Sequence, residues 1–126
     1  MRLRNPLATA HNHGSAGSGL SHWWAQRFSA IGLVFLTVWL IWMLGSIVGA
    51  SHAEVVSTLS HPFHAAMAIL FVVASIYHGQ LGLQVIIEDY SSSHLRATAL
   101  IVSVRIISIL GGLLAVIAIL QLALGV

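Results

Sequence analysis

Three long apolar stretches limit what this chain can fold into. They cover about residues 26–49, 62–88 and 97–124, and each is at least 24 residues long. About 20 apolar residues are enough for an α-helix to cross the hydrocarbon core of a bilayer. Because the backbone N–H and C=O groups find no water there, such stretches must be helical. The sequence therefore predicts an all-α fold, a transmembrane bundle of three helices in a single membrane-anchor domain of residues 1–126.

Composition supports a membrane protein and excludes several other classes. The chain is 58% hydrophobic and 6% charged, with a mean hydropathy of +0.95, which no soluble domain of this size matches. Its net charge of +2 comes from five arginines against three acids, too few cations to bind a nucleic acid. The chain has no cysteine, so it holds no iron–sulfur cluster of its own. A redox centre must use histidine or belong to a partner.

Residues 1–21 form a polar N-terminal segment rich in Gly and Ser. Such a segment buries too little apolar surface to order itself, so we expect it to be mobile, and it lacks the apolar run of a signal peptide. Ser21 is a plausible N-cap for the first helix. His11 and His13 raise the possibility of a metal site, but two histidines in such a tail are more often incidental.

The distribution of arginines predicts the orientation in the membrane. Lys and Arg are absent from the link between residues 49 and 61, whereas the N-terminal side and the link before the third span carry arginines: Arg2, Arg4, Arg27 and Arg96. Cytoplasmic loops carry the excess of positive residues. We therefore expect a cytoplasmic N-terminus.

His78 is the polar residue that points to a function. It lies ten residues before Glu88, which is about 15 Å along a helix and near the bilayer midplane. An ionisable residue at that depth is rare and usually functional. Three of the four residues that share its helix face are small, so a flat group has room beside it: Ala74, Ser75, Leu81 and Gly82. The alternative is a hydrogen bond from His78 to a neighbouring helix, with Gly82 as a packing contact.

Two segments carry a family resemblance. His78 is followed by Gly82 and then by Asp89 and Tyr90, eleven and twelve residues after the histidine, and the first span opens with Ser-His-Trp-Trp-Ala-Gln-Arg at residues 21–27. With three spans, this resembles the small hydrophobic membrane anchor of succinate dehydrogenase (complex II). The resemblance covers most of the chain.

The resemblance implies a role for each of these residues. His78 would be an axial ligand of the iron of haem b, with Gly82 packed against the haem. Tyr90 would hydrogen-bond ubiquinone, with Asp89 orienting that phenol or relaying a proton. The non-functional interpretation of this pair is an interfacial tyrosine beside a solvated acid. Arg27, expected level with Asp89 and Tyr90, would contact a haem propionate or the quinone pocket, or serve only as a positive-inside anchor.

The second axial ligand is expected from another polypeptide. The remaining histidines of the three spans and links are expected at or outside the interfaces: His22, His52, His61, His64 and His94. A companion anchor would then clamp the haem from the other side. Arg105, nine residues into the third span, either reaches the inner headgroups, which we favour, or contacts a haem propionate or a partner carboxylate.

The resemblance thus implies a subunit of succinate:quinone oxidoreductase in the inner (cytoplasmic) membrane of a bacterium. It would pass electrons from succinate to ubiquinone and would not itself oxidise succinate. Its partners would be a second membrane anchor, an iron–sulfur subunit and a flavoprotein subunit. The alternative function is a small transmembrane scaffold or assembly protein without a cofactor. A low-spin b-type spectrum that depends on His78 separates the two.

Overall fold

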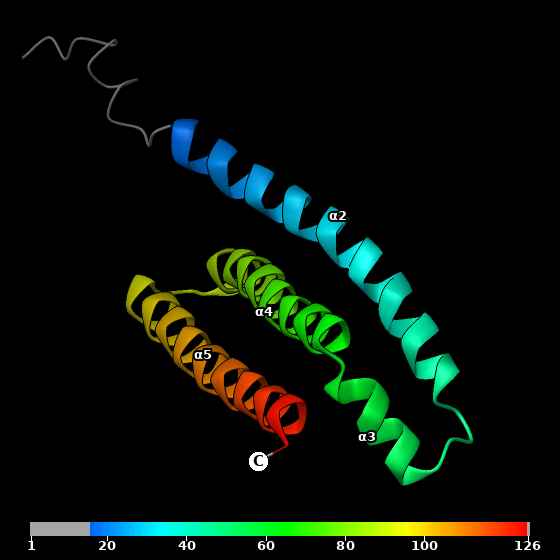
Figure 1. Cartoon of the computed structure of the whole chain (residues 1–126). Helices are drawn as coiled ribbons and strands as arrows, with labels where there is room; N and C mark the ends of the chain where they lie inside the picture. The colour runs from blue at the N-terminus through cyan, green and yellow to red at the C-terminus, as the bar shows by residue number, and fades with distance from the viewer. Residues whose placement is uncertain (1–15, 126) are drawn as a thin grey trace, which may run out of the picture.

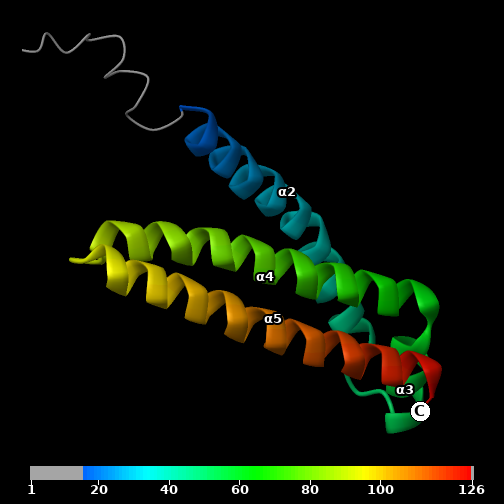
Figure 2. The same cartoon turned by 90° about the vertical axis from the view of Figure 1, so that its left-hand side faces the viewer.

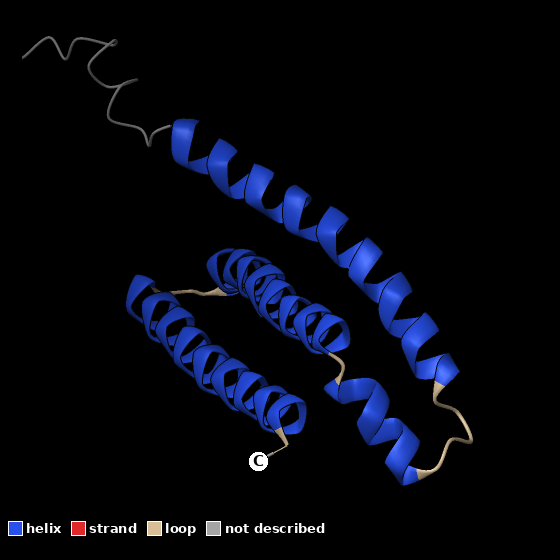
Figure 3. Cartoon of the chain, in the orientation of Figure 1, coloured by secondary structure: helices blue, strands red, loops and turns tan. Residues whose placement is uncertain are grey.

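A computed structural model describes residues 16–125 of the chain. Four helices and no strand occur in this range (Figures 1 and 3). The helices are α2 (Ala16–Ser46), α3 (His52–Ser60), α4 (Pro62–Tyr90) and α5 (His94–Leu124). Three of them are long and apolar enough to cross a membrane, at Gly19–Ser46, Pro62–Tyr90 and His94–Leu124. The predicted all-α fold with three membrane helices is confirmed.

Helix α4 is central to the arrangement. It packs against α5 along its length, and the two run antiparallel, side by side, joined by residues 91–93 (Figures 1 and 2). Helix α2 contacts α4, and it contacts neither α3 nor α5 among the described residues. It crosses α4 at an angle, with its first turns standing away from it (Figure 2). The short helix α3 contacts α4 and α5 at one end of the bundle.

Local capping explains where the helices begin and end. Pro62 occupies the first turn of α4, where its missing N–H costs no hydrogen bond, and His61 Nδ1 accepts from the N–H of Phe63 at 3.2 Å. Ser93 Oγ accepts from the N–H of Arg96 at 3.3 Å and caps α5. Gly125 ends α5 with a φ of +72°, a left-handed conformation that favours glycine.

The structure differs from the sequence-based expectation in two places, the start of α2 and the link between α2 and α4. Helix α2 begins at Ala16, so Ser21 lies inside the helix and is not its N-cap. The link between residues 49 and 61 contains the helix α3, capped by Ser51 and Glu54. The rest of the predicted mobile tail, residues 1–15 with His11 and His13, lies outside the described residues.

Most apolar side chains face outward. Within residues 19–125, the buried apolar side chains are Met43 and Ala65, at 3% and 6% exposed. Large exposed apolar side chains occur on all three long helices; Phe35, Leu70 and Leu114 are examples. A surface of this kind is stable in contact with lipid or with other membrane helices, and not in water.

Candidate functional site

His78 lies in the middle of α4 and faces α2. It is half-buried, and both of its ring nitrogens have polar neighbours on α2. Nδ1 is 2.9 Å from Ser29 Oγ, and Nε2 is 3.4 Å from Gln26 Nε2. Ser29 Oγ also donates a hydrogen bond to the carbonyl oxygen of Gln26 at 3.1 Å. The imidazole is therefore held between two polar side chains that are one helical turn apart.

Gln26 and Ser29 are the site residues that the sequence reasoning missed. Gln26 belongs to the segment that carries the resemblance, but no role was expected for it, and Ser29 was not considered. A signal existed, because residues i and i+3 share a helix face. Two polar residues at that spacing, near the start of an otherwise apolar span, indicate that this face meets another polar group.

Ser29, which contacts the imidazole, also lines a groove between α2 and α4, although His78 is not among the residues that line it. Its volume is about 650 Å³, and its lining is almost entirely apolar. Ser29 lines it, together with the small residues Gly32 and Ala74 and the aromatic residues Phe28 and Phe35. Pockets of this volume and composition accept cofactor-sized ligands. The small residues that leave room for a flat group therefore lie partly on α2, and not only on α4.

Gly82 lies one turn after His78 on α4. A Cβ at this residue would be 3.6 Å from Gln26 Nε2, an ordinary van der Waals contact. The side chain of Gln26 thus lies between Gly82 and the Nε2 atom of His78. A group that binds His78 through Nε2 has to displace this amide.

Asp89 and Tyr90 form the last residues of α4. Tyr90 is 87% exposed and Asp89 is exposed as well. Neither side chain makes a hydrogen bond within residues 16–125. Eleven residues of helix separate Asp89 from His78, which is about 16 Å along the axis. The pair is therefore open to a partner or a ligand at the end of the helix.

Arg27 does not join Asp89 and Tyr90 in this structure. Its guanidinium lies 4.9 Å from the ring centroid of Trp23, a cation–π contact. Helices α2 and α4 run antiparallel, as the contact of Ser29 with His78 and the stacking of Trp39 on His64 show. In this register Arg27 lies near the level of His78, and the first turn of α2 lies near the level of Asp89. The expectation that Arg27 is level with Asp89 and Tyr90 was wrong.

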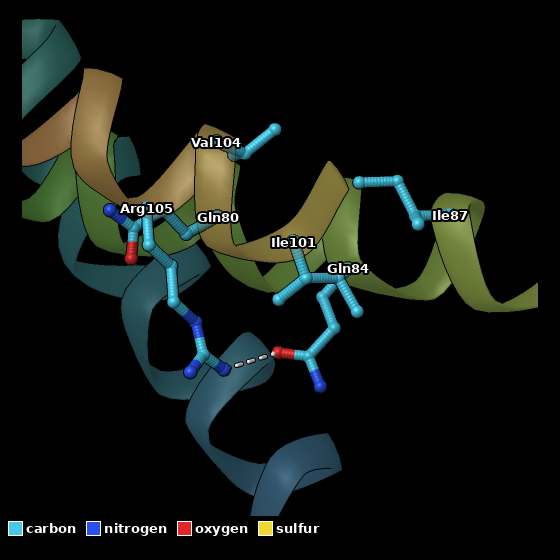
Figure 4. A pocket seen from close by; sticks show the side chains of 6 residues that line it. All are labelled: Gln80, Gln84, Ile87, Ile101, Val104 and Arg105. Atoms are coloured by element: carbon cyan, nitrogen blue, oxygen red, sulfur yellow. Dashed lines mark hydrogen bonds between the residues drawn. The ribbon is translucent and has the colours of Figure 1, made fainter. Parts of the chain in front are cut away.

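Arg105 bonds to a neighbouring helix. Its Nη2 donates to Gln84 Oε1 at 3.1 Å (Figure 4), and Gln84 Nε2 donates to Glu88 Oε1 at 2.8 Å. Gln84 thus connects the arginine to an acid one turn nearer the end of α4. A small pocket between α4 and α5 lies beside this contact. The favoured expectation, that Arg105 only reaches the headgroups, omitted Gln84 as its partner.

His64 belongs to a separate aromatic cluster near the other end of α4. Its ring stacks on Trp39 and Trp42, with centroids 5.9 and 6.3 Å away, and its edges meet Phe63 and His61. The atoms His64 Nδ1 and Trp39 Nε1 are covered and have no hydrogen-bond partner among the described residues. Fourteen residues of α4 separate this cluster from His78, so the two histidines do not form one site.

Comparison with known proteins gives a consistent family. The model of the succinate dehydrogenase/fumarate reductase transmembrane subunit family matches residues 1–123. A succinate dehydrogenase hydrophobic membrane anchor subunit from Rickettsia bellii is 36% identical over 108 residues, 86% of each chain. Those of Rickettsia conorii and Paracoccus denitrificans are 38% and 33% identical over 104 residues, 82% of this chain and 82% and 81% of theirs. No solved structure gives a significant match.

Proposed function

The chain belongs to the succinate dehydrogenase/fumarate reductase transmembrane subunit family, and from this premise we propose that it anchors a succinate:quinone oxidoreductase and supplies part of two sites. His78 is one axial ligand of haem b. Asp89 and Tyr90 form part of the ubiquinone site. The observation that carries the proposal is His78 itself, a half-buried imidazole in the middle of an apolar helix, whose contact Ser29 lines a groove large enough for a cofactor.

The residues around His78 fit a haem. Imidazole nitrogen is a usual axial ligand of haem iron, and a bound haem supplies a one-electron redox centre. The neighbours on α2 are neutral, and the groove wall contains Gly32 and Ala74, which leave room for a flat group. Gln26 Nε2 is 3.4 Å from Nε2 of His78, longer than usual for such a bond, so the amide is weakly held and is free to turn aside.

Arg27 is assigned to the haem side of the site. Its neighbours Gln26 and Ser29 contact the imidazole, and its guanidinium is exposed apart from the contact with Trp23. A guanidinium binds carboxylates strongly and often through two hydrogen bonds. We therefore favour a haem propionate over the quinone as the partner of Arg27.

The second axial ligand comes from a companion anchor. Four of the other described histidines lie on α3 or close to a helix end: His52, His61, His64 and His94. His22 is one turn before Gln26 on α2, the helix that contacts both ring nitrogens of His78. The groove between α2 and α4 has no lining residue from α5, so a companion helix has access to it.

Quinone reduction is assigned to the exposed end of α4. The phenol of Tyr90 is 87% exposed and is available to donate a hydrogen bond to a quinone carbonyl. Asp89 precedes it and is available to orient the phenol or to relay a proton from water. Succinate oxidation belongs to the flavoprotein subunit, and electrons reach the membrane through an iron–sulfur subunit, because this chain has no cysteine to hold a cluster.

The proposed setting is the inner (cytoplasmic) membrane of a bacterium, with the N-terminus in the cytoplasm. Arg2 and Arg4 precede α2 in the sequence, and Arg96 stands in the first turn of α5, next to the end of α4. The link that contains α3 has neither lysine nor arginine. This asymmetry supports the orientation.

Expression with and without a companion anchor tests the proposal. The chain alone should not hold a stable six-coordinate haem, whereas the assembled complex should show a low-spin b-type spectrum. In the complex, His78→Ala should lose or greatly weaken that spectrum. His64→Ala and His22→Ala are matched controls and should retain it. A low-spin b-type spectrum from the isolated monomeric chain would show that the second ligand is internal.

A further inference from the structure

The polar contacts around His78 favour one position for the proton on its ring. Ser29 Oγ has one hydrogen, and it is donated to the carbonyl oxygen of Gln26 at 3.1 Å. The same oxygen lies 2.9 Å from His78 Nδ1. With the hydroxyl hydrogen directed at this carbonyl, Ser29 accepts at the second contact. In this arrangement Nδ1 of His78 carries the proton.

The contact on the Nε2 side of the ring is consistent with a proton on Nδ1. A neutral imidazole protonated at Nδ1 has a lone pair on Nε2, and the atom of Gln26 that faces Nε2 is its amide nitrogen, a donor. The opposite tautomer requires Ser29 to donate to Nδ1, which gives up its bond to the Gln26 carbonyl, and requires the Gln26 amide to turn over. It makes two hydrogen bonds where the observed arrangement makes three.

We infer that Ser29 is a positioning residue for the metal ligand: it accepts a hydrogen bond from Nδ1 of His78 and so keeps Nε2 unprotonated, facing the amide of Gln26 on α2. This inference rests on the proposed function, in which Nε2 binds haem iron. Metal-ligating histidines commonly donate their other N–H to a nearby acceptor, which fixes the tautomer and the ring orientation. Here the acceptor is a hydroxyl, and its orientation is fixed in turn by the backbone of α2.

Gln26 has a different role from Ser29. Its contact with Nε2 is 3.4 Å, against 2.9 Å for Ser29 with Nδ1, and its Oε1 is covered without a hydrogen-bond partner among the described residues. The amide thus occupies the ligand position of Nε2 while its own hydrogen bonding is incomplete. On haem binding the amide would have to move from Nε2, whereas the contact of Ser29 with Nδ1 would not need to change.

The two residues make a matched pair of variants in the assembled complex. Ser29→Ala should weaken haem retention by about 10- to 100-fold, as for other partners of metal-bound histidine. The haem that remains should show shifted EPR g values and a higher midpoint potential, because a ligand that donates no hydrogen bond is less basic. Ser29→Thr keeps the hydroxyl and should restore all three properties. Gln26→Ala leaves the backbone carbonyl in place and should hold haem at least as well as the parent complex.

Two readouts separate this inference from the proposed function. Loss of haem in His78→Ala together with unchanged haem in Ser29→Ala would overturn the role of Ser29 and leave the ligand in place. Retention of haem in both variants would overturn both. Should Ser29→Ala fail to assemble, ¹⁵N NMR of the full-length parent chain without haem decides. Protonated Nδ1 on His78 supports the inference, and protonated Nε2 refutes it.

Discussion

Gly112 on α5 faces Ile76 on α4 so closely that a Cβ at residue 112 would lie 2.5 Å from Ile76 Cδ1. Gly112 is also buried, so the contact is part of the packing between the two helices. Gly112→Ala must push the end of Ile76 aside, and because Cδ1 is the free end of a flexible side chain, we expect a cost at the lower end of the about 1–3 kcal/mol that overpacking causes. We expect a matching loss in the free energy of unfolding, measured in detergent or bilayers.

Two further variants check that the contact with Ile76 causes the loss of stability in Gly112→Ala. At Gly111 a Cβ would meet nothing within 4 Å, so Gly111→Ala should not destabilise the chain. Ile76→Val removes the Cδ1 atom, and adding it to Gly112→Ala should recover most of the loss. An equal loss in the two glycine variants would mean that helix flexibility, and not packing, is affected.

Replacing Tyr90 separates quinone chemistry from succinate chemistry. Tyr90→Phe removes one hydrogen-bond donor, worth about 0.5–1.5 kcal/mol, so quinone reduction should fall by roughly 2- to 12-fold. Succinate oxidation with a soluble artificial acceptor should be unchanged, because that site lies in another subunit. Tyr77→Phe is the matched control, since Tyr77 is also on α4 and is 49% exposed. Equal loss of both activities would indicate misassembly.

Asp89→Asn removes the charge next to Tyr90 without changing the size of the side chain. We expect quinone reduction to fall in the same direction as in Tyr90→Phe, and by less if Asp89 only orients the phenol. A steeper dependence of the rate on pH in the variant would indicate that Asp89 relays protons. Steady-state quinone reduction measured across a pH range, with the soluble-acceptor assay as reference, gives both results.

Arg27→Gln distinguishes the two roles that were expected for this arginine. If Arg27 binds a haem propionate, the variant loses a positive charge beside the haem, so the oxidised form becomes relatively more stable and the midpoint potential falls. The KM for quinone should stay the same. A changed quinone KM with an unchanged potential would place Arg27 in the quinone pocket. Arg96→Gln, at the start of α5, is a suitable control.

The cap of α3 should respond to acid. The backbone N–H of Ser51 and then its hydroxyl donate to Glu54 Oε2, each at 2.8 Å, and these bonds hold the pKa of Glu54 below its usual 4.5. The carboxylate therefore stabilises α3 fully above pH 4.5, and this contribution is lost as the pH falls through the folded-state pKa. Ser51→Ala should raise the pKa of Glu54, measured by NMR titration. An unchanged pKa would mean that the bond from the Ser51 hydroxyl does not form in solution, since the variant keeps the backbone N–H.

The sequence predicted the three membrane helices but missed α3. Apolar length is a strong signal for a span, whereas α3 has only nine residues. Its start was nevertheless visible, because Ser51 is followed three residues later by Glu54, the capping-box spacing. The start of α2 was misplaced since Ser21 has the chemistry of an N-cap, and the sequence does not reveal that the helix continues five residues before it.

For the candidate site, the sequence predicted only those spatial relations that lie within a single helix. His78, Gly82, Asp89 and Tyr90 all lie on α4, and their relative positions follow from helix geometry alone. Partners on another helix depend on how the helices face each other. Because α2 is apolar on nearly every side, its periodicity does not show which face meets α4. Ser29 and Gln26 were missed for this reason, and the level of Arg27 was misjudged.

Among the described helices, α2 contacts only α4. The contact of Ser29 with His78 therefore depends on how α2 docks on α4. Helices α4 and α5 are joined by three residues, 91–93, and form a hairpin without help from α2. The imidazole meets Ser29 only when the first helix docks on α4. Under the proposed function, a chain whose first helix has not reached its place therefore has a His78 that is not yet positioned to bind haem. Cofactor capture would in this way select correctly inserted molecules from immature ones.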